Sequence, residues 1–156
     1  MPIITLHTDI NAPIERCFDL SRSIDLHKIS TEHTKEEAID GVTSELINLG
    51  EWVTWRAVHF GVSQTLSTKI TEFERPVFFV DEMVKGAFKS FRHEHHFEST
   101  GNGTRMTDRF DYKSPFGILG KFQGAWEIER NEELIGGDKV NIHLIYGSGW
   151  MKFVSR

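Results

Sequence analysis

The chain begins with a strand pattern that is followed by two short helix patterns. Apolar and polar residues alternate from Ile3 to Ile10, which is the period of a half-buried strand. Asn11 is a residue type that caps helices and Pro13 fits a first helical turn, so we expect a helix to begin here. Its apolar stripe consists of Ile14, Cys17 and Phe18. Ser23 is expected to cap a second helix, whose apolar residues are Ile24, Leu26 and Ile29.

Between Glu36 and Val84 the apolar residues recur with a period of two, which indicates strands. Gly and Pro divide this stretch into segments rich in β-branched and aromatic residues. The expected strands are Glu36–Ile39, Thr43–Asn48, Glu51–Phe60, Val62–Phe73 and Val77–Val84. Short strands separated by turn residues predict a meandering antiparallel sheet.

The sheet is expected to continue into a β-hairpin over Lys89–Tyr112, with its turn at Thr100–Gly103. Residues whose numbers sum to about 203 then face each other across the two strands. The opposed pairs are Phe97 with Met106, His95 with Asp108, and His93 with Phe110. Each strand therefore carries ionisable groups on a face that is otherwise mostly apolar.

The C-terminal region has a helical pattern that changes back to a strand-like one. Ser114 is expected to cap a helix that runs to Trp126 and could continue over Glu129–Leu134, with Gly136-Gly137 as a stop. From Gly137 to Arg156 the alternation of apolar and polar residues resembles a strand instead.

Length and composition limit the classes of protein to which this chain could belong. The chain has 156 residues, which favours one domain spanning residues 1–156. A net charge of −5 argues against a nucleic-acid binder, which needs a basic surface. A single cysteine excludes an intrachain disulfide and fits a reducing compartment. The N-terminus lacks a signal-peptide pattern and no apolar run is long enough to span a membrane, so we expect a cytoplasmic protein.

Four segments resemble the SRPBCC superfamily, the START-like and polyketide-cyclase-like proteins. These segments are INAPIERCFDL (Ile10–Leu20), GEWVTWRAVHFG (Gly50–Gly61), Ile70–Glu98 and Gly103–Gly120, and together they extend over roughly the first 120 residues. The resemblance implies an α+β helix-grip fold, in which a curved antiparallel sheet wraps around a C-terminal helix. It also implies a cavity for an apolar ligand between sheet and helix. None of the four segments is a catalytic motif.

The chain departs from the superfamily pattern after residue 120, where a long final helix is expected. Residues 121–156 instead combine one helical stretch with an atypical strand-like tail. A deletion, a shifted reading frame near Lys121 and a genuine variant would each account for this pattern. A short helix would leave the cavity more open, or closed by a partner chain, so homodimerisation through the tail is one hypothesis.

Three interpretations of the polar residues on the hairpin remain open. His95 and Asp108 are expected to be in contact, and His93 is expected to be a diagonal neighbour of Asp108. The carboxylate would favour the protonated form of the imidazole. These residues could be a satisfied structural pair, a polar anchor for a ligand, or an acid–base pair. A zinc site at His93, His95 and Asp108 is a fourth option, but strand histidines two residues apart are common without metal. We therefore expect no metal and no cofactor.

The function that we predict is the binding of an apolar or amphipathic small molecule, such as a lipid, isoprenoid, aromatic or polyketide-like compound. The alternatives are a cyclase, dehydratase or hydrolase that uses the His–Asp pair, and a partner-binding module. Asp81 could join the lining or lie at a strand end, and the sequence does not decide which face of Glu51–Phe60 points inward. The ligand-binding residues that we predict are His95, Asp108, His93, Trp55, His59, Phe79, Met83, Phe91, Phe97 and Phe110.

Overall fold

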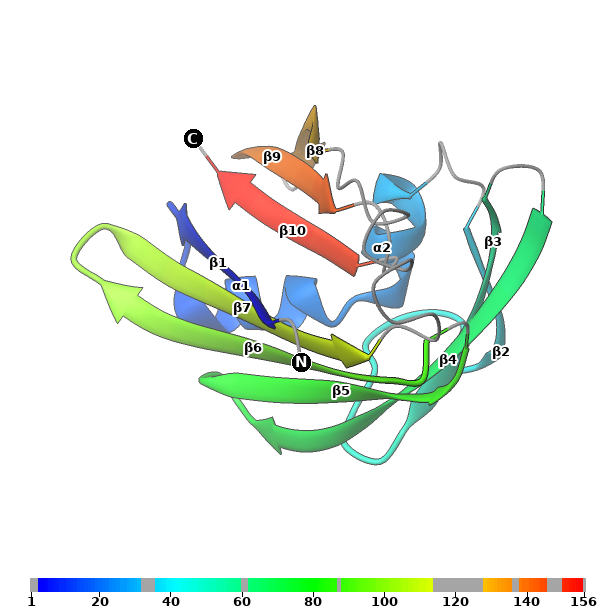
Figure 1. Ribbon diagram of the computed structural model, residues 1–156. Coiled ribbons are helices and arrows are strands. Elements are labelled where there is room, and N and C mark those ends of the chain that lie inside the picture. Colours follow the sequence, from blue (N-terminus) through cyan, green and yellow to red (C-terminus); the bar gives the residue numbers. More distant parts are fainter. Residues whose placement is uncertain are drawn as a thin grey trace.

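A curved antiparallel sheet is the main element of the fold. The computed structural model describes residues 3–31, 36–59, 62–86, 88–113, 128–135, 138–145 and 150–155. The strands of this sheet are β1 (Ile3–Ile10), β2 (Glu37–Gly41), β3 (Trp52–His59), β4 (Val62–Glu74), β5 (Phe78–Lys85), β6 (Ser90–Thr100) and β7 (Gly103–Lys113). Their order is β1-β7-β6-β5-β4-β3-β2 (Figure 1). Strands β2 to β6 each pair with the next strand in sequence, which confirms the predicted meander, and β7 pairs with β1.

Two helices, α1 (Ile14–Ser21) and α2 (Ile24–Ser30), lie on the concave side of the sheet (Figure 1). The side chain of Ser23 accepts a hydrogen bond from the backbone N–H of Leu26, so the predicted cap of α2 is confirmed. The predicted cap at Asn11 is wrong, because α1 begins after Pro13 and no side chain caps it. A residue of β7 stabilises the turn before α1 instead, because the Thr104 hydroxyl donates a hydrogen bond to the Ala12 carbonyl at 2.8 Å.

The β6–β7 hairpin has the predicted register. Thr100 pairs with Gly103, and every pair in this ladder sums to 203. Gly103 is required at the turn because a Cβ there would lie 2.1 Å from the carbonyl oxygen of Ile10.

The predicted strand over Thr43–Asn48 is wrong. This segment makes only one isolated bridge, between Leu46 and Ser23. Its backbone is bonded to the start of α2, since Ile24 N–H donates to the Glu45 carbonyl at 2.9 Å and Glu45 N–H donates to the Asp25 carboxylate at 2.7 Å. These bonds satisfy backbone groups that a ladder would otherwise use.

The core lies between the concave face and the helices. On β3 the residues Val53, Trp55 and Ala57 are buried whereas Trp52 and Val58 are exposed, which decides the face that the sequence left open. The residues of the apolar core are Ile10, Cys17, Phe18, Ile24, Leu26, Ile47, Val53, Trp55, Ile70, Phe79, Phe97 and Met106.

The C-terminal region forms a second, three-stranded sheet in the order β10-β9-β8. Its strands are β8 (Ile128–Ile135), β9 (Asp138–Ile145) and β10 (Trp150–Ser155), and β10 contacts β1, α1 and α2 (Figure 1). The helix predicted from Ser114 to Trp126 and its stop at Gly136-Gly137 lie outside the described residues. The predicted continuation of this helix over Glu129–Leu134 is wrong, because the segment forms an antiparallel ladder with β9. The local sequence pattern does not indicate this long-range strand partner. The strand-like tail is confirmed.

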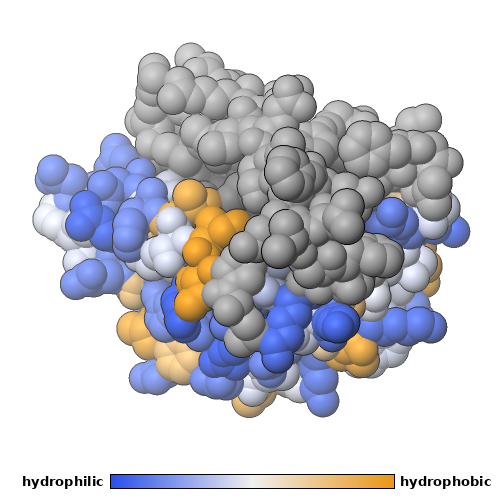
Figure 2. All heavy atoms as spheres, viewed as in Figure 1, coloured by the Kyte–Doolittle hydropathy of each residue, from blue (hydrophilic) through white to orange (hydrophobic). Residues whose placement is uncertain are grey.

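The outward face of the sheet is a charged surface. Arg92 contacts the carboxylates of Glu72 and Glu94, and Arg105 contacts Asp9 on the neighbouring strand. Figure 2 shows hydrophilic residues over most of the described surface in this view, with apolar residues between them. Among the described residues, no helix has the length and hydropathy needed to cross a bilayer.

Candidate functional site

Four ionisable side chains meet on the concave face at the centre of the sheet. They come from the adjacent strands β5, β6 and β7, where Asp81 pairs with His93 and His95 pairs with Asp108. The exposed fractions of Asp81, His93, His95 and Asp108 are 0%, 5%, 2% and 5%. Buried charges of this kind are rare unless they are paired.

His95 is held between two carboxylates. Its Nδ1 lies 2.8 Å from Oδ1 of Asp108 and its Nε2 lies 3.1 Å from Oδ1 of Asp81. Because an ionised carboxylate only accepts hydrogen bonds, both ring nitrogens donate when His95 is protonated.

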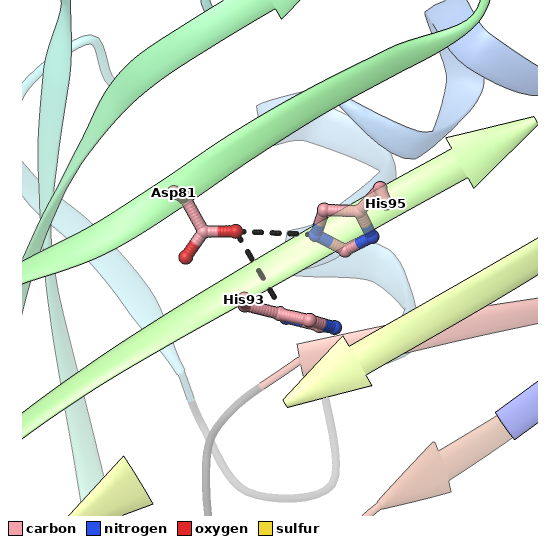
Figure 3. Close-up of side chains that lie close together, drawn as sticks. All are labelled: Asp81, His93 and His95. Atoms are coloured by element: carbon pink, nitrogen blue, oxygen red, sulfur yellow. Dashed lines mark hydrogen bonds and ion pairs between the residues drawn. The ribbon is translucent and has the colours of Figure 1, made fainter. Parts of the chain in front are cut away.

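His93 lies beside this arrangement and faces the same two carboxylates. Its Nε2 is 3.5 Å from Oδ1 of Asp108 and its Nδ1 is 3.9 Å from Oδ1 of Asp81. The ring centroids of His93 and His95 are 3.9 Å apart. Figure 3 shows Asp81, His93 and His95 pointing toward one another from β5 and β6. The four residues therefore form one network, which we call the His–Asp cluster.

Aromatic rings enclose the His–Asp cluster along the sheet. Phe79 stacks on His95 with ring centroids 4.3 Å apart, and Phe110 meets the ring of His93 edge-on at 5.3 Å. Phe91 packs against Phe110 at 5.2 Å. Apolar surroundings strengthen the electrostatic interactions inside the cluster, because the local dielectric is lower than that of water.

The cluster separates the pKa values of its two histidines. Burial opposes the charge of His95, but hydrogen bonds to Asp108 and Asp81 outweigh it and raise the pKa of His95 to about 9. Burial would raise the pKa of Asp108, yet its contacts with His93 and His95 hold that pKa well below its usual range. Burial, together with the charge of His95, lowers the pKa of His93. At neutral pH a charged His95 thus lies beside a neutral His93.

A family model described as polyketide cyclase / dehydrase and lipid transport matches residues 10–135. The chain belongs to this family. The SRPBCC membership that the sequence suggested is therefore confirmed. No curated protein matches the chain in sequence.

Solved structures of other proteins share the fold of this polyketide cyclase / dehydrase and lipid transport family member. Protein TTHA0849 from Thermus thermophilus has 19% identity and a TM-score of 0.61, and the match covers 78% of this chain and 80% of that one. Protein Ms6760 from Mycobacterium smegmatis has 16% identity and a TM-score of 0.61, with 78% of each chain covered. The ginseng major latex-like protein 151 from Panax ginseng has 16% identity and a TM-score of 0.54, with 78% and 88% covered. At these identities the likeness concerns the fold alone.

Within this family member, the predicted aromatic residues fall into two groups on either side of the His–Asp cluster. Phe79 and Phe97 pack edge-on against Phe18 of α1, with centroids 5.5 and 5.4 Å apart, so they belong to the core. Phe91 and Phe110 lie on the other side, next to His93.

The remaining predicted residues lie elsewhere on β3 and β5. Trp55 is buried against His27, with ring centroids 4.1 Å apart. Met83 is half-buried near the end of β5. The side chain of His59 lies outside the described part of the structure.

Two buried polar contacts were not predicted, one within the His–Asp cluster and one outside it. Asp81 is buried and bonds directly to His95, whereas its alternation with Phe79 and Met83 suggests only a place on the lining or at a strand end. A second buried acid–base pair joins His27 Nε2 to Glu36 Oε2 at 3.3 Å. No periodicity signals this pair, because the two residues come from α2 and from the residue before β2.

Proposed function

We propose that this protein binds an apolar or amphipathic small molecule on the concave face, with the His–Asp cluster as its polar anchor. The observation that carries the proposal is a buried, charged cluster among aromatic rings in a member of a polyketide cyclase / dehydrase and lipid transport family. Such a combination of apolar surface with few polar groups is typical of small-molecule sites.

The packing of the aromatic residues on the two sides of the His–Asp cluster supports a location for the ligand. Phe18 of α1 packs onto Phe79 and Phe97, so that end of the concave face is filled by core side chains. We assign the ligand to the opposite side, near Phe91 and Phe110. Burial of apolar ligand surface would stabilise the complex by about 25 cal/mol per Å².

The anchor would take a hydrogen-bond donor of the ligand. Oδ2 of Asp81 is buried and has no hydrogen-bond partner among the described residues. A buried carboxylate oxygen without a partner is costly, and a ligand hydroxyl would satisfy it. The amphipathic end of the ligand would therefore carry a hydroxyl group.

Native mass spectrometry of the mildly purified chain tests the binding. We expect a co-purified lipid-like or aromatic compound that is released on denaturation and not chemically changed. His96→Gln is the matched control, because His96 lies one residue from His95 but is exposed on the opposite face. Loss of the compound in Asp81→Asn but not in His96→Gln would support the anchor, whereas no bound compound, together with no uptake of a fluorescent fatty acid, would contradict the proposal.

Acid–base catalysis is a second candidate, and the separated pKa values of the two histidines favour it. A charged His95 beside a neutral His93 provides one proton donor and one proton acceptor, as in a cyclase or dehydratase. Turnover lost in His95→Gln while ligand affinity is kept would favour this candidate over binding alone.

We also propose that residues 1–156 form a single helix-grip domain and that the three-stranded sheet mediates a homodimer. Sedimentation velocity over a range of concentrations tests the dimer. A mass of 18.0 kDa at every concentration would contradict it.

A further inference from the structure

Asp81, His93 and His95 direct their ligand-type atoms toward one point. One oxygen or nitrogen from each residue lies within 4.8 Å of the other two (Figure 3). Two imidazoles and one carboxylate are a ligand set that divalent first-row transition metals accept. All three side chains are buried on paired strands, which limits their motion.

The spacing is close to that of a metal site. Four ligands at 2.0–2.1 Å from a tetrahedral ion are about 3.3 Å apart. The nitrogen Nε2 of His95 lies 3.1 Å from Oδ1 of Asp81, and Nδ1 of His93 lies 3.9 Å from the same oxygen. A rotation of the His93 ring toward this oxygen would shorten the longer of these two distances.

Asp108 occupies the position of an orienting residue. Its Oδ1 lies 2.8 Å from Nδ1 of His95 and 3.5 Å from Nε2 of His93. Each imidazole thus directs one nitrogen to Asp108 and the other toward Asp81. Metal-binding histidines characteristically donate their second ring N–H to a carboxylate, which fixes the tautomer and the ring orientation.

The charges of the cluster suit a divalent ion. Histidines bind metals in their neutral form, and the two carboxylates then carry two negative charges in a buried site. A divalent cation balances these charges in place of the proton that His95 carries without metal, so metal binding releases this proton.

We propose that Asp81, His93 and His95 bind one divalent first-row transition-metal ion, zinc or a close neighbour, and that Asp108 positions both imidazoles. Three protein ligands leave at least one coordination position for water or for an oxygen of a bound molecule. The proposal replaces the absence of metal that the sequence suggested. Of the three residues that the sequence offers as zinc ligands, Asp108 becomes the positioning residue. Asp81 on the neighbouring strand takes its place as the third ligand.

Titration of the untagged, chelator-treated full chain with Zn²⁺ and Co²⁺ tests this site. Calorimetry is expected to give one ion per chain, and Co²⁺ is expected to give the intense visible absorption of a tetrahedral site. His93→Gln and Asp81→Asn are expected to weaken binding by about 100-fold or more. Asp108→Asn is expected to weaken it by about 10–100-fold, the usual effect of removing an orienting partner.

His96→Gln is the matched control and is expected to bind Zn²⁺ like the unmodified chain, since His96 is exposed on the other face of β6. Circular dichroism identifies any variant that does not fold. If a variant does not fold, NMR of the unmodified chain takes its place as the test. The imidazole nitrogen resonances of His93 and His95 are then expected to shift when Zn²⁺ is added. Failure of both ions to bind stoichiometrically, equal affinity in His93→Gln, or unshifted resonances would each overturn the proposal. These outcomes do not depend on whether an organic ligand binds.

Discussion

Raising the pH from 6.5 to 9 is expected to destabilise the folded protein through His95. The pKa of this residue is about 9 in the folded state, against 6.5 for an unperturbed histidine. A group with a higher pKa in the folded state stabilises it fully below the unfolded value and loses that contribution as the pH rises through the folded value. The difference between these two pKa values corresponds to about 3 kcal/mol of stability.

Between pH 6.5 and 9, the titration of His95 affects the free energy of unfolding separately from that of His93 and Cys17. The lowered pKa of His93 places its effect on stability below pH 6.5. Burial raises the pKa of the Cys17 thiol, so this group reduces stability only near and above pH 9. Most of the His95 contribution, about 2–3 kcal/mol, should therefore be lost between pH 6.5 and 9.

Urea unfolding of the chelator-treated, metal-free chain at intervals across this pH range measures the effect. The free energy of unfolding of the unmodified chain and of His96→Gln should fall in parallel, whereas that of His95→Gln should change far less. The comparison concerns the slope with pH, so a general destabilisation of His95→Gln does not affect it. Equal slopes in all three proteins would refute the reasoning that the two carboxylates hold a charged imidazole.

Two further predictions concern packing and backbone geometry. Phe18→Ala should lower the free energy of unfolding by about 3–5 kcal/mol, because Phe18 is fully buried in the aromatic core, whereas Val84→Ala at an exposed position should change it by less than about 0.5 kcal/mol. Thermal and urea unfolding measure both, and equal losses would contradict the assigned core. Gly103→Ala should destabilise by at least about 1 kcal/mol, because its Cβ would overlap a backbone oxygen, whereas a Cβ at Gly101 meets nothing within 4 Å. A Gly101→Ala variant that is as unstable as Gly103→Ala would contradict this account of the turn.

The central hairpin illustrates how much of the site local information can predict. The pairing of His95 with Asp108 follows from the turn at Thr100–Gly103, because a short connection leaves few alternative registers. Asp81 could not be placed in the same way. The register of β5 against β6 is not fixed by a tight turn, and its partner β4 contains an irregularity between Ile70 and Glu72.

The second buried pair, His27 with Glu36, shows the same limit. The contact depends on how α2 packs onto the sheet, and neither residue stands out in the sequence. The extent of the C-terminal helix pattern was overestimated for a related reason. Residues Glu129–Leu134 are strand because β9 offers a ladder of backbone partners, which outweighs a weak helical preference.

Side-chain alternation and short turns were enough to predict most strands of the main sheet, the hairpin register and the superfamily, but they mispredicted Thr43–Asn48 and Glu129–Leu134. Long-range packing was needed to show that the Trp55 face of β3 points inward and that Phe79 and Phe97 belong to the core. It was also needed to show that a second carboxylate, Asp81, reaches His95. Both faces of β3 carry aromatic residues, so the sequence pattern does not identify the buried face. The chemistry of the concave face therefore depends on long-range strand pairing, which brings Asp81 to the two histidines.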